Sequence, residues 1–279
     1  AAPAIPVPTA GDKAREATLE SRVQEAVRHL DSLESEIAAG QLKWEADHPP
    51  TPALSSANLL AHWKFDQTVD DGMEETSTSV FEATTASYQD GILGSALTLQ
   101  GLGYVNAGDR LSLESDDTLT MTAWIRPTTR EGRMNIMART DKADKLFRGF
   151  AWQLLGGQPI FYLISSFPDD MIQVQAKQAL EPNQWHHVAV CYDGSGKADG
   201  VTLFVNGKVQ ERGPVIDNLK GAILTDQPFW IGNGQPPAKF KGQLDELRVY
   251  DRVLKEEEIA SLPGLSISSL LVIAAKERN

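Results

Sequence analysis

The chain has 279 residues, of which 26 are basic and 38 acidic, so that its net charge is −12. This length and a hydrophobic content of 41% are typical of a soluble globular protein with one large domain and an appendage. The excess of acidic residues argues against nucleic acid or an anionic membrane as partner. The single cysteine, Cys191, excludes an internal disulfide, and no apolar run reaches the roughly 20 residues that span a bilayer.

The N-terminal region is predicted to form one long helix. Residues 1–11 are rich in Pro and Ala and are expected to be disordered. Further on, apolar residues recur at alternating spacings of four and three, namely Leu19, Val23, Ala26, Leu30, Leu33 and Ile37. This heptad-like stripe predicts a helix over 12–46, followed by a linker over 47–58. The stripe must bury against the next domain, the C-terminal tail or a partner chain, and a helical hairpin or coiled coil is the favoured explanation.

Short alternating segments fill most of the chain after the linker. Residues 119–125 alternate apolar and polar side chains before Pro127 ends the pattern. Segments 150–155 and 160–165 flank a Gly-Gly-Gln-Pro turn, and a four-residue turn would place Gln153 opposite Tyr162. The other face of this hairpin then enters the core with Phe150, Trp152, Leu154, Phe161 and Leu163. The whole set predicts a two-sheet antiparallel β-sandwich.

The C-terminal part is predicted to pass from a strand over 244–250 to a short helix over 253–262. In a regular strand Asp245 shares a face with Leu247 and Val249, whereas Glu246 and Arg248 share the other face and can pair. A carboxylate that faces the core is costly unless it is hydrogen-bonded or bound to a cation. Asp245 therefore needs a partner.

The segment from Gly242 to Ile259 closely resembles the C-terminal signature of laminin-G-like jelly rolls in the concanavalin A-like lectin/glucanase superfamily. The family's Leu-Asp-Glu-Leu-Arg strand, tyrosine and Glu-Glu-Ile helix correspond to residues 244–248, Tyr250 and 257–259. Further matches follow in the family's order from about residue 59, including Trp124 and Pro127. The resemblance implies a jelly roll over 59–262, with a tail over 263–279 that packs on the N-terminal helix or on a neighbouring domain.

The flanking segments are also similar to those of the jelly-roll insert in planctomycete-type multidomain cytochrome c proteins. The haem motif Cys-x-x-Cys-His is absent, so we expect no haem. This similarity implies a larger exported bacterial protein and an extracytoplasmic location (periplasmic, cell-surface or secreted).

Calcium is the cofactor that the resemblance implies. In the family a structural Ca²⁺ often lies where the first and last strands adjoin, and Asp66 and Asp245 are the matching side chains, with a backbone carbonyl near Gln100 or Gly101 as a third ligand. Oxygen ligands suit Ca²⁺ better than zinc. The alternative is that Asp245 accepts hydrogen bonds from loop amides.

Carbohydrate binding needs aromatic side chains that stack on sugar rings and polar side chains that reach the hydroxyl groups. The candidate binding residues are Tyr162 with Gln153, Arg139, and Trp230 with Asn233. The alternative for each is a structural role, because aromatic residues on sandwich strands usually fill the core.

Catalysis is not expected. The superfamily's glucanases carry Glu-x-Asp-x-x-Glu on one strand, and the nearest string here, at Glu114 and Asp116, lacks the second glutamate. His186 and His187 lie on an alternating strand, where a buried structural histidine is favoured over a general base. We therefore predict a non-catalytic, lectin-like module that binds a polysaccharide. A structural or protein-interaction module that uses the helix and tail is the alternative, and a glycoside hydrolase is a weaker one.

Overall fold

A computed structural model describes residues 9–47, 57–73, 79–141 and 146–263. Its contacts divide the chain into two units, residues 1–52 with 270–279 and residues 53–269, which we describe separately. The described part of the first unit is a single helix, α1 (Ala10–Asp47). None of the helices in the described ranges has the length and apolar character needed to cross a membrane.

Helix α1 begins at a polar cap. The Asp12 amide donates to the Thr9 hydroxyl (3.2 Å), and the Thr9 amide donates to the Asp12 carboxylate (2.9 Å), so that each residue satisfies a free amide of the other. The stripe predicted from the heptad spacing is exposed along α1, at Leu19, Val23, Leu30, Leu33 and Ile37. Residues 48–56 of the predicted linker (47–58) and residues 264–279 of the predicted tail (263–279) lie outside the described residues, and so does the predicted packing of the tail.

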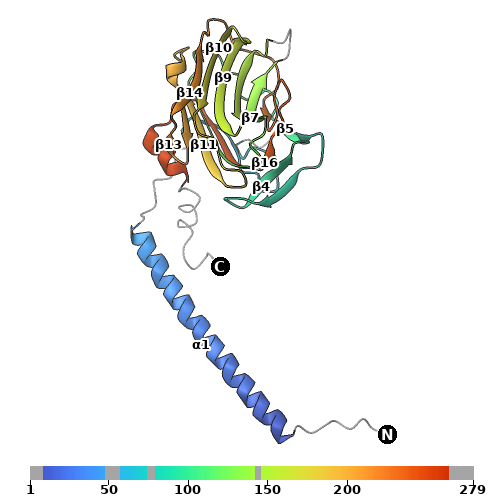
Figure 1. Ribbon diagram of the computed structural model, residues 1–279, viewed down its shortest axis with the longest axis vertical. Helices are drawn as coiled ribbons and strands as arrows, with labels where there is room; N and C mark the ends of the chain where they lie inside the picture. The colour runs from blue at the N-terminus through green and yellow to red at the C-terminus, as the bar shows by residue number, and fades with distance from the viewer. Residues whose placement is uncertain (1–8, 48–56, 74–78, 142–145, 264–279) are drawn as a thin grey trace, which may run out of the picture. The chain divides into compact units, whose positions relative to one another are not determined.

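The second unit is a sandwich of two antiparallel sheets, as predicted (Figure 1). Sheet A has the order β13 (Lys208–Val209), β12 (Val201–Val205), β11 (His186–Tyr192), β6 (Leu119–Pro127), β16 (Lys241–Tyr250), β4 (Ser95–Gln100) and β3 (Ser87–Asp90), and β1 (Leu59–Trp63) also pairs with β16. Sheet B has the order β14 (Arg212–Asp217), β10 (Asp170–Ala176), β9 (Gln158–Ser166), β8 (Gly149–Leu155), β7 (Arg133–Thr140), β15 (Trp230–Ile231), β5 (Tyr104–Asn106) and β2 (Val80–Glu82). A 3₁₀ turn, η2, covers Ala198–Gly200, and a short helix covers 256–263.

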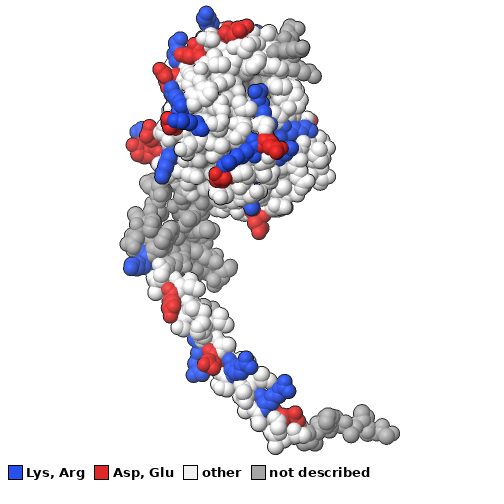
Figure 2. Space-filling model, viewed as in Figure 1, with Lys and Arg blue, Asp and Glu red and all other residues white. Residues whose placement is uncertain are grey.

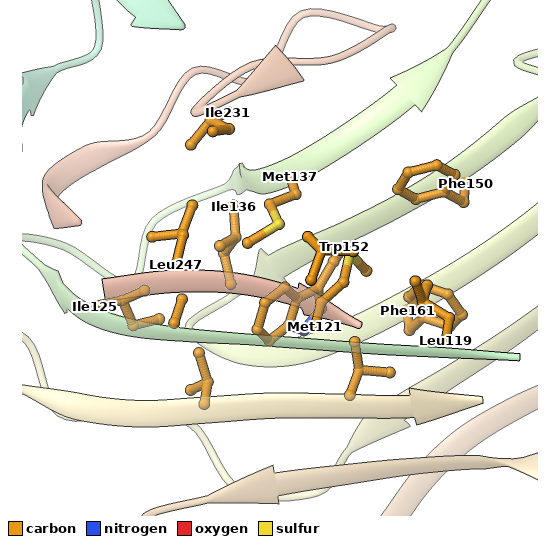
Figure 3. Close-up of a cluster of buried hydrophobic side chains, with 14 of the residues drawn as sticks. Leu119, Met121, Ile125, Ile136, Met137, Phe150, Trp152, Phe161, Ile231 and Leu247 are labelled. Carbon is orange, nitrogen blue, oxygen red and sulfur yellow. The ribbon is translucent and has the colours of Figure 1, made fainter. Parts of the chain in front are cut away.

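The core lies between the two sheets. Trp152 of β8 and Phe161 of β9 point from sheet B toward Met121 of β6 in sheet A (Figure 3). All five hairpin residues that the alternating pattern assigns to the core are buried there, so this prediction is confirmed. On the surface in view in Figure 2, acidic and basic side chains are interspersed. The sandwich therefore rests on apolar packing between alternate residues of facing strands.

The predicted register of the β8–β9 hairpin is wrong. Gln153 lies opposite Ile160, and Tyr162 lies opposite Ala151, because Leu155 already pairs with Gln158. The turn therefore has two residues instead of four. Gln153 and Tyr162 still share one face of sheet B, as diagonal neighbours on adjacent strands.

A buried histidine on β11 predicts an acid-sensitive fold. His187 is enclosed beside Trp124, and neither of its ring nitrogens has a hydrogen-bond partner in the part of the chain that the structure describes. Burial, together with nearby Arg248, lowers its pKa from 6.5 to about 3. The unfolded chain then binds more protons between pH 6.5 and 3, so the free energy of unfolding falls as the pH drops through this range. At pH 5 the buried, neutral His187 lowers the free energy of unfolding by about 2 kcal/mol relative to neutral pH.

His187→Leu removes this proton-linked loss of stability. We therefore expect the change that it makes in the free energy of unfolding to be about 2 kcal/mol more favourable at pH 5 than at pH 7. Urea unfolding at both pH values measures this difference. His29→Leu, on the exposed surface of α1, is the matched control. Equal effects of His187→Leu at the two pH values would contradict the assignment.

Candidate functional site

A small hollow of about 240 Å³ lies on the outward face of sheet B. Its floor is formed by side chains that alternate with the core residues of β8 and β9: Ala151, Gln153, Tyr162 and Ile164. Tyr162 and Ile164 belong to a small apolar cluster on this face, separate from the main core. Alternation along two strands thus places an apolar floor with one amide on the outside of the sandwich.

Two phenylalanines from neighbouring segments form the aromatic wall of the hollow. Phe147 precedes β8 and Phe167 follows β9, and their rings lie edge to face with centroids 6.0 Å apart. Phe167 is 40% exposed, whereas Tyr162 on the floor is only 4% exposed. Burial raises the pKa of the Tyr162 phenol, although the charge of Arg133 opposes this. The side chain that is free to stack on a ligand is therefore Phe167.

A buried amide supplies the polar group of the floor. Gln153 Nε2 donates to Asn135 Oδ1 at 2.7 Å, and Asn135 Nδ2 donates to the Ala238 carbonyl at 3.1 Å. These bonds hold the Gln153 side chain in one orientation. Its Oε1 is buried and has no partner among the described residues. An acceptor fixed in this way is ready for a donor from a ligand, because a buried acceptor without a partner is costly.

The third wall is the segment after β15. Gly234 packs so closely on β7 that a Cβ there would lie 2.8 Å from Ala138 Cβ. Next to it, the Gln235 amide donates to Thr140 Oγ1 (2.9 Å), and this hydroxyl donates to the Gln235 carbonyl (3.1 Å). Gln235 and Pro236 are thereby fixed at the edge of the hollow. Arg133 also lines the hollow, with its guanidinium carbon 5.9 Å from the centroid of the Tyr162 ring.

Of the five predicted ligand-binding residues, the structure brings Gln153 and Tyr162 together in this hollow. Arg139 lies elsewhere, donating to the Asp109 and Arg110 carbonyls and lining another hollow with Asp141 and Asp226. Trp230 is buried and pairs with Asn106 and Ala138 without lining the hollow. Asn233 is buried two residues before Gln235, and its Oδ1 has no partner within the described ranges.

Sequence reasoning missed Phe147, Phe167, Arg133 and Gln235. None of the four belongs to an alternating pattern that would mark it as outward-facing beside Tyr162. One signal was present, since Phe167 stands next to Pro168 just after a predicted strand, and an aromatic residue in such a loop is a candidate for exposure.

A second hollow, of about 430 Å³, lies on sheet A. Its lining is polar and includes Gln89, Gln100, Arg126, Asn183, Lys241 and Gln243. Arg126 donates to the Asn183 carbonyl and to Gln243 Oε1 at 3.1 Å each, so part of this lining is already satisfied. No aromatic side chain lines it. The hollow on sheet B is therefore the better candidate for stacking on a ring.

The predicted metal ligands Asp66 and Asp245 both hold the turn over residues 91–95. Asp245 Oδ2 accepts the amides of Ile92 (2.6 Å) and Leu93 (3.2 Å), and Asp66 Oδ1 accepts the Ser95 amide (2.8 Å). Gly91 allows this approach, because a Cβ there would lie 2.5 Å from Asp245 Oδ2. Burial raises the pKa of Asp245 to about 7, although the amides of Leu93 and Ile92 oppose this.

The side chain of Asp245 does not share the face predicted from the regular strand. Asp245 lies opposite Trp124, on the outward face of sheet A, while Leu247 and Val249 face the core. A bulge between Asp245 and Arg248, with Glu246 at φ 49°, inserts an extra residue and shifts the alternation. Asp245 is nevertheless fully buried, as expected, because the turn over 91–95 covers its carboxylate.

These residues fit a hydrogen-bonded turn better than a calcium site. Gln100 lies at the far end of β4 from Ser95, and no group of three or more His, Cys, Asp or Glu side chains within the described ranges could hold a metal. Among the described atoms of this turn, Asp245 Oδ1 alone is buried without a hydrogen-bond partner, which would favour a cation. Calcium binding stays a prediction from the family resemblance.

A ligand that binds only the folded state raises the midpoint of thermal unfolding. A turn held by hydrogen bonds alone predicts the same midpoint, within about 1 °C, in EDTA and in millimolar CaCl₂, whereas the predicted calcium site requires a higher midpoint in CaCl₂. Differential scanning calorimetry measures it. A clear rise in calcium that is lost in Asp245→Asn would instead establish the site.

The family follows from comparison with known proteins. A family model described as the concanavalin A-like lectin/glucanases superfamily matches residues 99–260, more than half of the chain. The chain belongs to this superfamily.

Solved structures with the same concanavalin A-like fold include domain 4 of AbnA, a GH43 extracellular arabinanase from Geobacillus stearothermophilus, in complex with arabinotriose. It shares 21% identity over 74% of this chain and 98% of its own, with a TM-score of 0.58. The binding domain of paraclostridial mosquitocidal protein 1 shares 16% identity (TM-score 0.57), and that of botulinum neurotoxin DC, solved with rat synaptotagmin II, shares 12% (TM-score 0.56). Matches to these two cover 77% and 76% of this chain but only 53% and 52% of theirs. At these identities the likeness shows the fold.

Among the described residues, the side chains that line the hollow on sheet B include no Asp or Glu. Glycosidases of the two-carboxylate type need two such groups about 5 to 10 Å apart. Glu114, from the sequence that partly matches the glucanase motif, stabilises a loop: its Oε1 accepts hydrogen bonds from the backbone amides of Ile223 (2.7 Å) and Leu224 (2.8 Å).

Proposed function

We propose that the jelly roll is a non-catalytic carbohydrate-binding module that holds a sugar in the hollow on sheet B. One observation carries this proposal: the exposed ring of Phe167 lies at the same hollow as Gln153 Oε1, a buried acceptor with no partner among the described residues. A sugar ring has an apolar face for stacking and hydroxyl groups that donate hydrogen bonds. The hollow offers one group for each of these features.

The comparisons support a binding role. One structure of this fold is a domain of an extracellular arabinanase with arabinotriose bound, and others are binding domains of toxins. On the same basis we propose that this chain acts outside the cytoplasm, as one part of a larger exported bacterial protein, where polysaccharides are accessible. This support for a binding role comes from the shared fold, so the experiments below test the binding site itself.

A glycan array and affinity gels with soluble polysaccharides test the proposal directly. We expect retention on at least one glycan, with release by the free sugar. Gln153→Ala should weaken this binding about ten-fold, whereas Gln175→Ala, which changes a buried amide of the same sheet outside the hollow, should preserve it. Failure to bind any glycan in both assays would refute the function.

The exposed stripe on α1 favours a second function, as a protein-interaction module that acts alone or beside sugar binding. Val23 and Ile37 occupy one set of core positions of a heptad, and Leu19 and Leu33 the other, which is the arrangement that two-stranded coiled coils prefer. Light scattering after size exclusion, with and without residues 1–50, tests self-association. A dimer that becomes a monomer on truncation supports it, and an unchanged monomer in both contradicts it.

A further inference from the structure

The hollow on sheet B contains an arginine whose charge nothing in the described protein neutralises. Arg133 has no hydrogen bond or ion pair to any described residue, and its guanidinium lies over the Tyr162 ring. We infer that the hollow selects a sugar that carries a carboxylate, such as a uronic acid residue, with Arg133 as the counter-ion. This inference rests on the proposed function and names its ligand class.

The other arginines of the jelly roll show how unusual this is. Six of them form ion pairs with carboxylates, namely Arg110, Arg130, Arg139, Arg212, Arg248 and Arg252. Two more, Arg126 and Arg148, donate to carbonyl or amide oxygens. In a chain with 38 acidic against 26 basic residues, an arginine without an acidic partner stands out. Its guanidinium keeps all five donors for a planar anion, and a carboxylate accepts two of them at once.

The remaining groups of the hollow agree with an acidic sugar. No carboxylate of the described residues lines the hollow, so none of them repels an anion there or competes for Arg133. Across the floor, Gln153 Oε1 is an acceptor and suits a hydroxyl group of the same ring. The three parts of a uronic acid, its ring, its carboxylate and a hydroxyl, therefore each have a partner, in Phe167, Arg133 and Gln153 respectively.

The size of the hollow limits how much of a chain can enter. Its volume of about 240 Å³ lies below the roughly 300–1,000 Å³ of pockets that enclose drug-sized ligands. One sugar residue fits, so the end of a polysaccharide chain, or a single side residue, is what the hollow can take.

Isothermal titration with matched pairs of sugars tests the inference. D-galacturonic acid is compared with D-galactose, and D-glucuronic acid with D-glucose, at pH 7 and low salt. For at least one pair we expect the acid to bind about ten-fold more tightly than its neutral partner, since a charge-assisted hydrogen bond exceeds a neutral one by about this factor. Salt should reduce this preference.

Arg133→Gln should remove the preference, Arg133→Lys should keep part of it, and Arg148→Gln, which changes an arginine outside the hollow, should leave it intact. Arg133 is partly exposed, so all variants are checked for an unchanged unfolding midpoint. Equal binding of acidic and neutral sugars by the unchanged protein, or a preference that survives in Arg133→Gln, would overturn the inference while leaving carbohydrate binding in place. Absence of binding to every sugar and glycan would instead overturn the proposed function.

Discussion

Replacing both Gln153 and Phe167 with alanine is expected to lower the affinity for the bound sugar by about 100-fold. Gln153→Ala removes the fixed acceptor on the floor of the hollow, and Phe167→Ala removes the exposed ring at its wall. A ligand hydrogen bond and an aromatic stacking contact are each worth about 1 to 1.5 kcal/mol, which corresponds to about ten-fold in affinity for each. Isothermal titration with the best glycan from the array measures both single variants and the double variant.

The controls separate binding from folding. Gln175→Ala removes a buried amide of sheet B, and Leu102→Ala removes an exposed apolar side chain, and neither residue lines the hollow. Both are expected to bind as the unchanged protein does. If the double variant binds normally while its unfolding midpoint is unchanged, the sugar does not use this hollow.

Asp245→Ala is expected to lower the free energy of unfolding by about 2 to 4 kcal/mol. The change leaves the partly buried amides of Ile92 and Leu93 without their acceptor, and each unpaired amide costs about 1 to 3 kcal/mol. Asp245→Asn should cost less, because its amide oxygen still accepts these bonds and no charge is buried. Urea unfolding measures both variants.

Asp66→Ala provides the comparison. Its exposed carboxylate accepts only the Ser95 amide of the same turn, so we expect a loss of about 1 kcal/mol. If Asp245→Ala proves no more destabilising than Asp66→Ala, the buried carboxylate does not hold the turn.

The β-sandwich could be predicted because the alternation of apolar and polar residues along its strands remains recognisable even where a bulge or turn interrupts it. Alternation in residues 119–125 and 150–165 marks the faces of two strands and a hairpin, and the burial of Trp152 and Phe161 follows from it. The need of Asp245 for a partner also followed from its residue type. Its direction did not, because the bulge at Glu246 has no recognisable signal in a sequence of apolar and charged residues.

Of the residues that line the hollow on sheet B, the sequence predicted only two that form its floor. Gln153 and Tyr162 belong to strands with a clear alternation, so they were found although the hairpin register was wrong. Phe147, Phe167 and Gln235 come from segments that join strands, and which of these segments meet over one face depends on the strand order of sheet B, β9–β8–β7–β15. Strand order is set by contacts between residues distant in the chain. Arg133 became informative only once the partners of the other arginines were known.

The most direct test of the account is a titration of ¹⁵N-labelled protein with the best glycan, followed by amide chemical shifts. The account predicts that the largest shift changes cluster at Phe147, Gln153, Tyr162, Phe167 and Gln235, around the hollow on sheet B. Changes that cluster instead at Gln89, Arg126 and Gln243, around the polar hollow on sheet A, would contradict it.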